Sequence, residues 1–496
     1  MTRLRPLPTT ALLCAMSLGP DAAPAQTPAL PELDRFVRAV AAAAAPAVFS
    51  VAVVRGDSVI HLAGYGARDA SGAPVTPRTA FYIASSTKSF TALAAALLAA
   101  RGVVDLDAPV GRYASEFSLP APLDASRITL RRLLSHRGGF ESEAIADRTA
   151  YIGNIGADSL LPLLARTAAP VDTGFTYTNT QFIVAARVLE RRTGVPWQEL
   201  VEREVLRPLG LARTTARMSA AAGWELAHGF GPGPEGHRPV ALKPDATMHA
   251  AGGMVMSAGD AATWLRAQLG RGRVGGRQLL PAAVVAETHR RVATQSADYD
   301  AVRRTGYGLG WQHGVMDGEL LLHHFGNYPG AFAHLSFMPE RGVGVAVFTN
   351  AEMGPFRAAA MMIARRAYDL ALARTERDAM YARWPGELSR LVGQQAERAR
   401  ADHRRRAARP AAPPRGWGAY AGTYHARDLG ELAIAPTPDG AELRFGAIRS
   451  RLEVLSGDTL RAELPPGRGG VPLPVTLGPD GRVRSLTLAG ATFERR

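Results

Sequence analysis

Cysteine, lysine and long apolar runs are scarce in this chain of 496 residues. Its single cysteine, Cys14, lies near the N-terminus, so the rest of the chain has no thiol for a disulfide or a cysteine-based metal site. No apolar run is long enough to cross a bilayer, because even the run that reaches Ala100 is broken by Arg101. These absences exclude a disulfide scaffold and a transmembrane protein.

Lysine is almost absent, since only Lys88 and Lys243 among the 58 Lys plus Arg are lysines. Arginine keeps its proton under working conditions, whereas a buried lysine can be tuned into a base. The chain therefore uses lysine where deprotonation would matter.

The stretch from Phe81 to Gly102 predicts an apolar, buried helix that begins near Ser85 and ends at the Gly102 cap. Ser85 and Lys88 are three residues apart in its first turn and share one face. A serine hydroxyl needs a nearby base to act as a nucleophile, and backbone N–H groups at a helix start can stabilise an oxyanion. This spacing also occurs by chance, but the scarcity of lysine favours an acyl-transfer site.

The N-terminus is typical of a secretory signal. Arg3 and Arg5 precede a short apolar run from Ala11 to Leu18, and Ala23-Pro-Ala25 stands before Gln26. This pattern predicts a signal peptide over residues 1–25 and export to the bacterial periplasm or the medium. The residue before Cys14 is leucine, which disfavours a lipoprotein anchor, and a merely disordered start is the alternative.

The net charge of +14 is partly local, because eleven arginines and five acids lie between Arg374 and Arg415. The composition predicts a solvated helix followed by a proline-rich linker. No aromatic interleaving or nucleic-acid motif accompanies it, so we expect no nucleic-acid partner. A weak contact with anionic envelope polymers or lipid headgroups is the alternative.

Short β-branched runs predict the sheets. Residues 48–54 and 58–62 form one expected hairpin, and three runs between Leu320 and Asn350 follow at hairpin spacing. After Trp417, short strands alternate with turn signals at Pro438-Asp-Gly440 and Pro479-Asp-Gly481. We therefore expect an α+β fold with an antiparallel sheet flanked by helices, plus a small C-terminal β barrel.

Two further segments carry candidate polar residues. Tyr177 and Asn179 lie in a loop just ahead of an amphipathic helix that ends near Gly194. Asn179 could be simply an N-cap and Tyr177 a packed aromatic residue. His136, before Arg-Gly-Gly, could be catalytic, but such a histidine more often shapes a turn.

Three separated motifs together resemble the serine β-lactamase and penicillin-binding-protein superfamily, specifically its class C β-lactamase-like serine hydrolases. They are Ser85-Ser-Thr-Lys88, Tyr177-Thr-Asn179 and, imperfectly, His324-Phe325-Gly326. The resemblance includes Ala251-Gly-Gly253 and Tyr307-Gly-Leu-Gly-Trp311 and runs roughly from Leu33 to Leu372. No Gly-x-Ser-x-Gly occurs, which argues against an α/β-hydrolase.

The resemblance implies a sheet with an all-α subdomain and a covalent acyl-enzyme at Ser85. The Lys88/Tyr177 pair would relay the proton, and which of the two is the base stays open because both ordinarily have pKa values near 10. It also implies an oxyanion hole from the backbone N–H groups of Ser85 and Asn327, and substrate binding by Asn179, His324, Phe325 and Gly326. His324 would supply polar or positive character, and His323 fits the spacing less well. The resemblance requires no metal or organic cofactor.

Phe325 stands where the superfamily usually has a hydroxyl that helps bind a substrate carboxylate. Phenylalanine cannot donate that bond, so we expect a small-molecule or peptide substrate whose peptide, amide or ester bond lies beside an apolar group. A true β-lactamase or D-alanyl-D-alanine carboxypeptidase is the alternative in chemistry. A non-catalytic envelope-binding protein is the alternative of another class.

The expected domains are a signal peptide over 1–25, a hydrolase domain over 26–373, an arginine-rich helix and linker over 374–415, and a β domain over 416–496. This last domain resembles the lipocalin-like barrels appended to some peptidases of the superfamily. There it would restrict access to the cleft or support assembly.

Overall fold

A computed structural model describes residues 30–496 except 70, 352–353, 468 and 489. The predicted signal peptide and Cys14 lie outside the described residues. Within the described part, no helix combines the length and apolar character that crossing a membrane requires.

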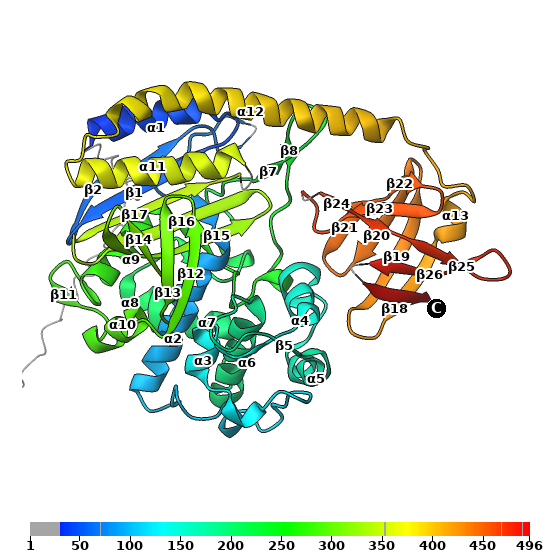
Figure 1. Cartoon of the computed structure of the whole chain (residues 1–496), viewed down its shortest axis with the longest axis horizontal. Helices are drawn as coiled ribbons and strands as arrows, with labels where there is room; N and C mark the ends of the chain where they lie inside the picture. Colours follow the sequence, from blue (N-terminus) through cyan, green and yellow to red (C-terminus); the bar gives the residue numbers. More distant parts are fainter. Residues whose placement is uncertain (1–29, 70, 352–353, 468, 489) are drawn as a thin grey trace, which may run out of the picture.

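The hydrolase region is built on one eight-stranded sheet whose neighbouring strands are all antiparallel (Figure 1). This confirms the expected sheet and its 48–62 hairpin. In spatial order the strands are β12 (Ala293–Tyr299), β13 (Val302–Tyr307), β14 (Gln312–Met316), β15 (Glu319–Tyr328), β16 (Ala331–Met338), β17 (Val343–Thr349), β1 (Phe49–Arg55) and β2 (Ser58–Tyr65).

Helices cover both faces of this sheet, which explains why β1 is apolar along most of its length. Phe49, Val51 and Val53 point to one face, and Ala52 and Val54 point to the other. The first face packs against α1 (Pro31–Ala43) and α11 (Pro355–Ala371), and the second against α2 (Thr87–Ala100), α9 (Ala258–Leu269) and α10 (Ala282–His289).

Helix α2 lies between the sheet and a helical subdomain, so it is buried on all sides. Phe90 and Leu93 join the core beneath the sheet, whereas Ala92, Ala95 and Leu98 join the core of the subdomain. The helices of that subdomain are α3 (Leu130–Leu134), α4 (Glu143–Asp147), the π-helix η4 (Arg148–Ile152), α5 (Ala157–Thr167), α6 (Asn179–Thr193), α7 (Trp197–Val201), the π-helix η5 (Glu202–Leu206) and α8 (Arg207–Leu209).

Short strands complete the hydrolase region. They are β3 (Ala80–Tyr82), β6 (Thr214–Thr215) and β9 (Val255–Ser257) in one sheet, with the pairs β4 (Phe140–Glu141) and β5 (Ala169–Pro170), β7 (Phe230–Gly231) and β8 (Arg238–Pro239), and β10 (Arg273–Val274) and β11 (Arg277–Gln278).

The arginine-rich segment forms the 30-residue helix α12 (Asp378–Ala407), which runs from the α1 and α11 layer to the C-terminal domain (Figure 1). Its first half is not merely solvated, because Tyr381 and Leu388 are buried against that layer. At its other end Arg406 binds Glu453 of the C-terminal domain at 2.8 Å.

The C-terminal domain pairs its strands in two sheets, and its expected closure into a barrel stays a prediction. After α13 (Trp417–Tyr420), one sheet has seven strands and the other three. In spatial order these are β21 (Ile448–Arg451), β20 (Gly440–Phe445), β19 (Gly430–Thr437), β18 (Gly422–Ala426), β27 (Ala491–Arg495), β26 (Val483–Leu488) and β25 (Val475–Leu477), then β22 (Glu453–Ser456), β23 (Thr459–Glu463) and β24 (Gly470–Leu473).

The C-terminal domain docks on η4 of the helical subdomain. Ile152 is 3% exposed and belongs to the apolar core of the C-terminal domain. Its carbonyl accepts a hydrogen bond from the Ala447 N–H at 2.6 Å, and a Cβ on Gly446 would lie 2.2 Å from that carbonyl oxygen. Burying such a side chain contributes roughly 1.5–3 kcal/mol.

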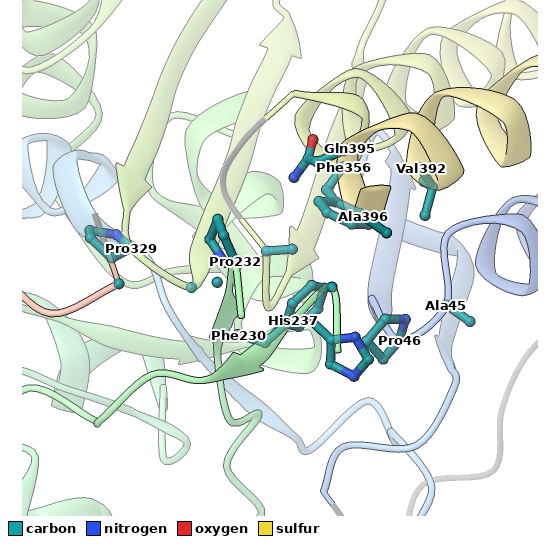
Figure 2. A pocket seen from close by; sticks show the side chains of 15 residues that line it. Ala45, Pro46, Phe230, Pro232, His237, Pro329, Phe356, Val392, Gln395 and Ala396 are labelled. Carbon is teal, nitrogen blue, oxygen red and sulfur yellow. The ribbon is translucent and has the colours of Figure 1, made fainter. Parts of the chain in front are cut away.

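A small cavity of about 60 Å³ marks the junction of three parts of the chain (Figure 2). Phe230 and His237 line it from the β7–β8 segment, Val392 lines it from α12, and Gly467 lines it from the C-terminal domain. The C-terminal domain therefore contacts the hydrolase region at more than one place.

Candidate active site

Ser85 lies in a strained turn at the entrance to α2. It belongs to the short 3₁₀ helix η1 (Ala84–Ser86), and the preceding Ala84 has a φ of +43°, which is uncommon for a residue with a side chain. Such a conformation costs roughly 1–3 kcal/mol and persists where surrounding contacts hold it. One of these contacts is the hydrogen bond that Ser86 Oγ donates to the His324 carbonyl at 2.9 Å.

Gly326 allows strand β15 to pass directly against this turn. A Cβ at Gly326 would lie 2.0 Å from the Ile83 carbonyl oxygen, so no larger residue fits. The strand therefore passes within contact of Ile83 and Ala84, the residues just before Ser85. This contact is the physical reason for glycine in the His-Phe-Gly motif.

Lys88 is completely buried, and its Nζ lies among three oxygens. Ser85 Oγ is 3.1 Å away, Asn179 Oδ1 is 2.8 Å away and the Ala251 carbonyl oxygen is 2.7 Å away. A charged ammonium could donate to all three oxygens. Burial lowers the pKa of Lys88 well below its ordinary value and so favours the neutral amine.

The neutral amine has two hydrogens and one lone pair. The Asn179 and Ala251 oxygens belong to carbonyl groups and can only accept, so they take the two N–H bonds. The lone pair is then left for the Ser85 hydroxyl, which can donate its proton to Nζ. This arrangement suits a general base beside a nucleophile.

Tyr177 reaches the same serine from the helical subdomain. Its ring centre lies 4.8 Å from Lys88 Nζ, and Ser85 is close enough to influence the pKa of its hydroxyl. Desolvation raises the pKa of Tyr177 above its ordinary value, while Ser85 and the charge of Arg304 act in the opposite direction. Because 40% of the residue is exposed, solvent limits the rise and the exposed ring forms part of the open surface beside Ser85.

His136 supports the Tyr177 loop, which agrees with the expected turn-forming role. Its φ is +58°, its carbonyl accepts from the Thr176 N–H at 3.0 Å, and its Nδ1 accepts from the Thr178 N–H at 3.2 Å. Its ring lies 4.4 Å from the Tyr177 ring. Burial and the nearby Lys88 lower the pKa of His136 well below its ordinary value, so it stays neutral.

Asn179 is the first residue of α6, and the N-cap is its neighbour Thr178, whose side chain accepts from the Thr180 N–H. The interpretation of Asn179 as a simple cap is therefore excluded. Its oxygen is engaged by Lys88, which leaves the amide nitrogen to donate to a substrate carbonyl.

His324 is 2% exposed and faces the α2 side of the sheet. Its Nδ1 donates to the Phe325 carbonyl at 3.2 Å, which leaves Nε2 to accept from the Tyr307 hydroxyl at 3.1 Å. Burial, with the nearby Lys88 and Arg304, lowers the pKa of His324 well below its ordinary value. His324 was expected to supply polar or positive character to the site. With a lowered pKa it can supply the polar character at neutral pH.

Phe325 points to the opposite face of the sheet, which corrects its expected place in the substrate site. It is 7% exposed and packs in the core beneath α1 and α11, with its ring 5.2 Å from Tyr299 and 4.6 Å from His334. His323 lies on this face as well, 4.3 Å from the Phe325 ring. Successive strand residues alternate in direction, so a motif match in sequence did not reveal which way this side chain points.

Three contributors to the site were not found from the sequence alone. The Ala251 carbonyl binds Lys88, the Tyr307 hydroxyl orients His324, and Arg304 lies close enough to change the pKa of Tyr177. Tyr307 and Ala251 stand in motifs of the resemblance, which were the available signals. Arg304 gave no such signal in the sequence, because arginine is abundant in this chain.

The chain is similar to several known proteins. The profile of the protein family described as Beta-lactamase matches residues 33–369. "Unguisins hydrolase ungD'" of Aspergillus campestris is 30% identical over 313 residues, which are 61% of this chain and 58% of that protein. The chain thus spans little more than half the length of this curated relative.

Two solved structures share the fold. The octameric penicillin-binding protein homologue from Pyrococcus abyssi matches with a TM-score of 0.59 and 22% identity, over 93% of this chain and 99% of that chain. The D-amino acid amidase from Ochrobactrum anthropi SV3 matches with a TM-score of 0.56 and 23% identity, over 69% of this chain and 98% of that chain. At these identities the likeness concerns the fold alone.

Proposed function

Because the chain belongs to the beta-lactamase family of serine hydrolases, we propose that it is an exported enzyme that cleaves a peptide, amide or ester bond through an acyl-enzyme at Ser85. The observation that carries this proposal is the position of the buried Lys88 amine, 3.1 Å from Ser85 Oγ with both carbonyl neighbours able only to accept.

In the proposed reaction Ser85 Oγ attacks the substrate carbonyl carbon and its proton passes to the Lys88/Tyr177 pair. The backbone N–H groups of Ser85 and Asn327 would stabilise the oxyanion. Collapse of the intermediate breaks the bond to the leaving amine or alcohol, which receives the proton from the same pair. A water molecule then attacks the acyl-enzyme, giving up one proton to the pair, and releases the acid and free Ser85.

The mechanism is tested by covalent labelling. A fluorophosphonate should modify wild-type protein at Ser85, located by peptide mass spectrometry, and should leave Ser85→Ala unlabelled. The same two proteins are then compared on a library of amides, esters and short peptides. A wild-type protein with no adduct at Ser85 and no turnover above the Ser85→Ala background would overturn the proposal.

An amide or peptide substrate with a neutral group beside the scissile bond is the leading candidate. The names of two similar proteins, a hydrolase of unguisins and a D-amino acid amidase, support a search among amides and peptides first. The library should therefore include amides of both D- and L-amino acids.

A second candidate substrate carries a carboxylate, and Arg304 is the observation that favours it. Within the described ranges its buried Nε has no hydrogen-bond partner and no acid forms an ion pair with it. The acid that acts on it from a distance, Asp300, is bound to Arg357 at 2.8 Å. Its guanidinium carbon lies 4.1 Å from the ring centre of Tyr299 and 6.0 Å from that of Phe325, and its charge acts on Tyr177 from a distance. A mostly buried guanidinium without a counter-charge would gain from a substrate anion that reaches it.

The two candidates are separated by a matched pair of peptides that differ only in a free carboxylate or a carboxamide at the C-terminus. If Arg304 binds the anion, Arg304→Met should lose roughly tenfold or more in kcat/KM on the acid alone. The exposed neighbour gives the control Arg303→Met, which should change neither substrate. Preference of wild type for the carboxamide, unchanged in Arg304→Met, would favour the neutral substrate.

Export follows from the predicted signal over residues 1–25 and stays part of the proposal. Expression of the full chain in a bacterium, with cell fractionation and N-terminal sequencing, should recover a periplasmic or secreted chain that begins at Gln26. A cytoplasmic chain that keeps residues 1–25 would contradict it.

A further inference from the structure

The second lysine of the chain lies in a cluster of tyrosines at the edge of the proposed site. Lys243 is 5% exposed, and its Nζ lies 4.2 Å from the ring centre of Tyr328, 5.6 Å from that of Tyr151 and 5.7 Å from that of Tyr82. It also donates a hydrogen bond to the Ala150 carbonyl. A cation held over aromatic faces is attracted by each ring, and the attraction grows where water is excluded.

These four side chains, the Lys243 cluster, come from separate parts of the fold. Tyr82 is on β3, Tyr151 is in η4 and Tyr328 ends β15, while Lys243 lies in the segment that leads to β9. The Tyr82 and Tyr328 rings meet edge to face at 5.2 Å, and the Tyr151 and Tyr328 rings are stacked at 6.2 Å. The cluster therefore joins the helical subdomain to two strands of the hydrolase region.

Two members of the cluster stand next to the proposed catalytic groups. Tyr328 directly follows Asn327, whose N–H is the proposed oxyanion donor, and Tyr82 precedes Ser85 by three residues. Tyr82 also donates its hydroxyl to the Gly252 carbonyl, one residue beyond the carbonyl that Lys88 binds. A shift of the cluster would move the backbone on both sides of the oxyanion position.

The other side of the cluster is tied to the C-terminal domain. Ala150 and Tyr151 immediately precede Ile152, which is buried in the core of that domain. Near Ile152, Asn154 donates to the Leu429 carbonyl at 3.0 Å. Gly467 of the C-terminal domain also packs near Pro329, where a Cβ on the glycine would lie 3.4 Å from the proline ring.

We infer that Lys243 is a positioning residue through which the docked C-terminal domain holds the end of β15 in place for the proposed acyl transfer. The inference rests on the proposed function for its effect on rate. The chain of contacts is continuous, from the core of the C-terminal domain through Ile152, the Ala150 carbonyl and Lys243 to the Tyr328 ring. A misplacement of about 1 Å at a reacting centre can cost about a hundredfold in rate, so this support matters for turnover.

The first experiment compares Lys243→Met and Lys243→Arg in the full chain. Methionine keeps the length of the side chain but removes the cation and the donor to Ala150, so kcat should fall about tenfold or more while KM changes less than threefold. Arginine restores a cation and a donor and should recover a large part of kcat. Should Lys243→Met fail to fold, Tyr151→Leu removes a ring from the cluster and carries the same expectation.

The second experiment asks whether Lys243 and the domain contact act together. Ile152→Ala loosens the docking and should lower kcat in the same way, and the double variant Ile152→Ala/Lys243→Met should be little worse than Lys243→Met alone. The matched control is Arg409→Met, which removes a 3.5 Å contact between Arg409, two residues beyond the end of α12, and Glu453, away from the cluster. This control should leave kcat unchanged.

Hydrogen–deuterium exchange supplies a readout that does not need turnover. Lys243→Met and Ile152→Ala should both speed exchange of the backbone amides of residues 326–330, and Arg409→Met should not. The inference is overturned if Lys243→Met keeps wild-type kcat and exchange, or if the effects of Ile152→Ala and Lys243→Met on kcat multiply. Failure of Ser85 labelling in wild type, with the exchange result intact, would count against the proposed function alone.

Discussion

Lys88 and Lys243, the only lysines of the chain, are both buried but have different surroundings. Lys88 Nζ contacts three oxygens, one of them a hydroxyl that can donate a proton to it. Lys243 Nζ donates to the Ala150 carbonyl, which can only accept, and lies near the faces of three tyrosine rings. Burial alone therefore does not make a lysine a base, because the neighbouring atoms decide what the amine can do.

Replacement by arginine should separate the two sites most strongly. Lys88→Arg should lower kcat/KM by about 10³-fold or more, because a guanidinium cannot lose a proton to act as a base. Lys243→Arg should stay within about tenfold of wild type, because it needs only a cation and a donor. Steady-state kinetics on one ester measure both, and equal losses would remove the distinction between the two lysines.

Tyr177→Phe tests whether the base at the first site is a pair rather than one amine. Loss of the hydroxyl should cost about 10²-fold in kcat, within the usual range for general acid–base groups, with little change in KM. The ring that packs on His136 is kept, so circular dichroism should be unchanged. Wild-type kcat in this variant would assign proton transfer to Lys88 alone.

The pH dependence of kcat/KM gives a third contrast. Burial lowers the pKa of Lys88, so the neutral base appears, and the rate rises, at a pH well below the ordinary lysine range. His324 is neutral because its pKa is lowered, so His324→Asn should not change the pH at which kcat/KM rises. If the pH at which kcat/KM rises is different in His324→Asn, the titrating group is the histidine instead.

Thermal stability should show the smallest effect, and with opposite signs at the two lysines. The lowered pKa of Lys88 means that the unfolded chain binds a proton that the folded chain does not, so stability is lost as pH falls from about 10.4 toward the folded pKa. Lys88→Met should therefore raise the unfolding midpoint by a few degrees at pH 7, and the gain should shrink toward pH 10. Lys243→Met should lower the midpoint, as scanning calorimetry can measure.

The sequence predicted those features that depend on local pattern. The run from Phe81 to Gly102 predicted helix α2, and β-branched runs at hairpin spacing predicted the antiparallel sheet. The motifs placed Ser85, Lys88 and Tyr177 in one site, and the resemblance is confirmed at the level of the family. The placement of Tyr177 needed the motif match, because no local pattern connects a loop to a helix that is ninety residues away in the sequence.

Other features depend on contacts between distant segments and could not be predicted. The direction of Phe325 follows from the register of β15 against β16, and the division of the C-terminal strands into two sheets follows from pairings that hairpin spacing leaves undetermined. Arg304 and the tyrosines around Lys243 became visible as neighbours of the site only in the fold. The sequence showed Lys243 only as the second of two lysines and gave no sign of the aromatic rings around it.

The insertion of Ile152 into the C-terminal domain has a practical consequence for dissecting the protein. A fragment that stops near residue 415 would expose Ile152, and more of the adjacent Tyr151, to water. An uncovered apolar patch of this kind promotes self-association, so such a fragment should precipitate or form oligomers. A polar substitution at Ile152 introduced together with the truncation should give a fragment of the hydrolase region that is better suited to crystallisation.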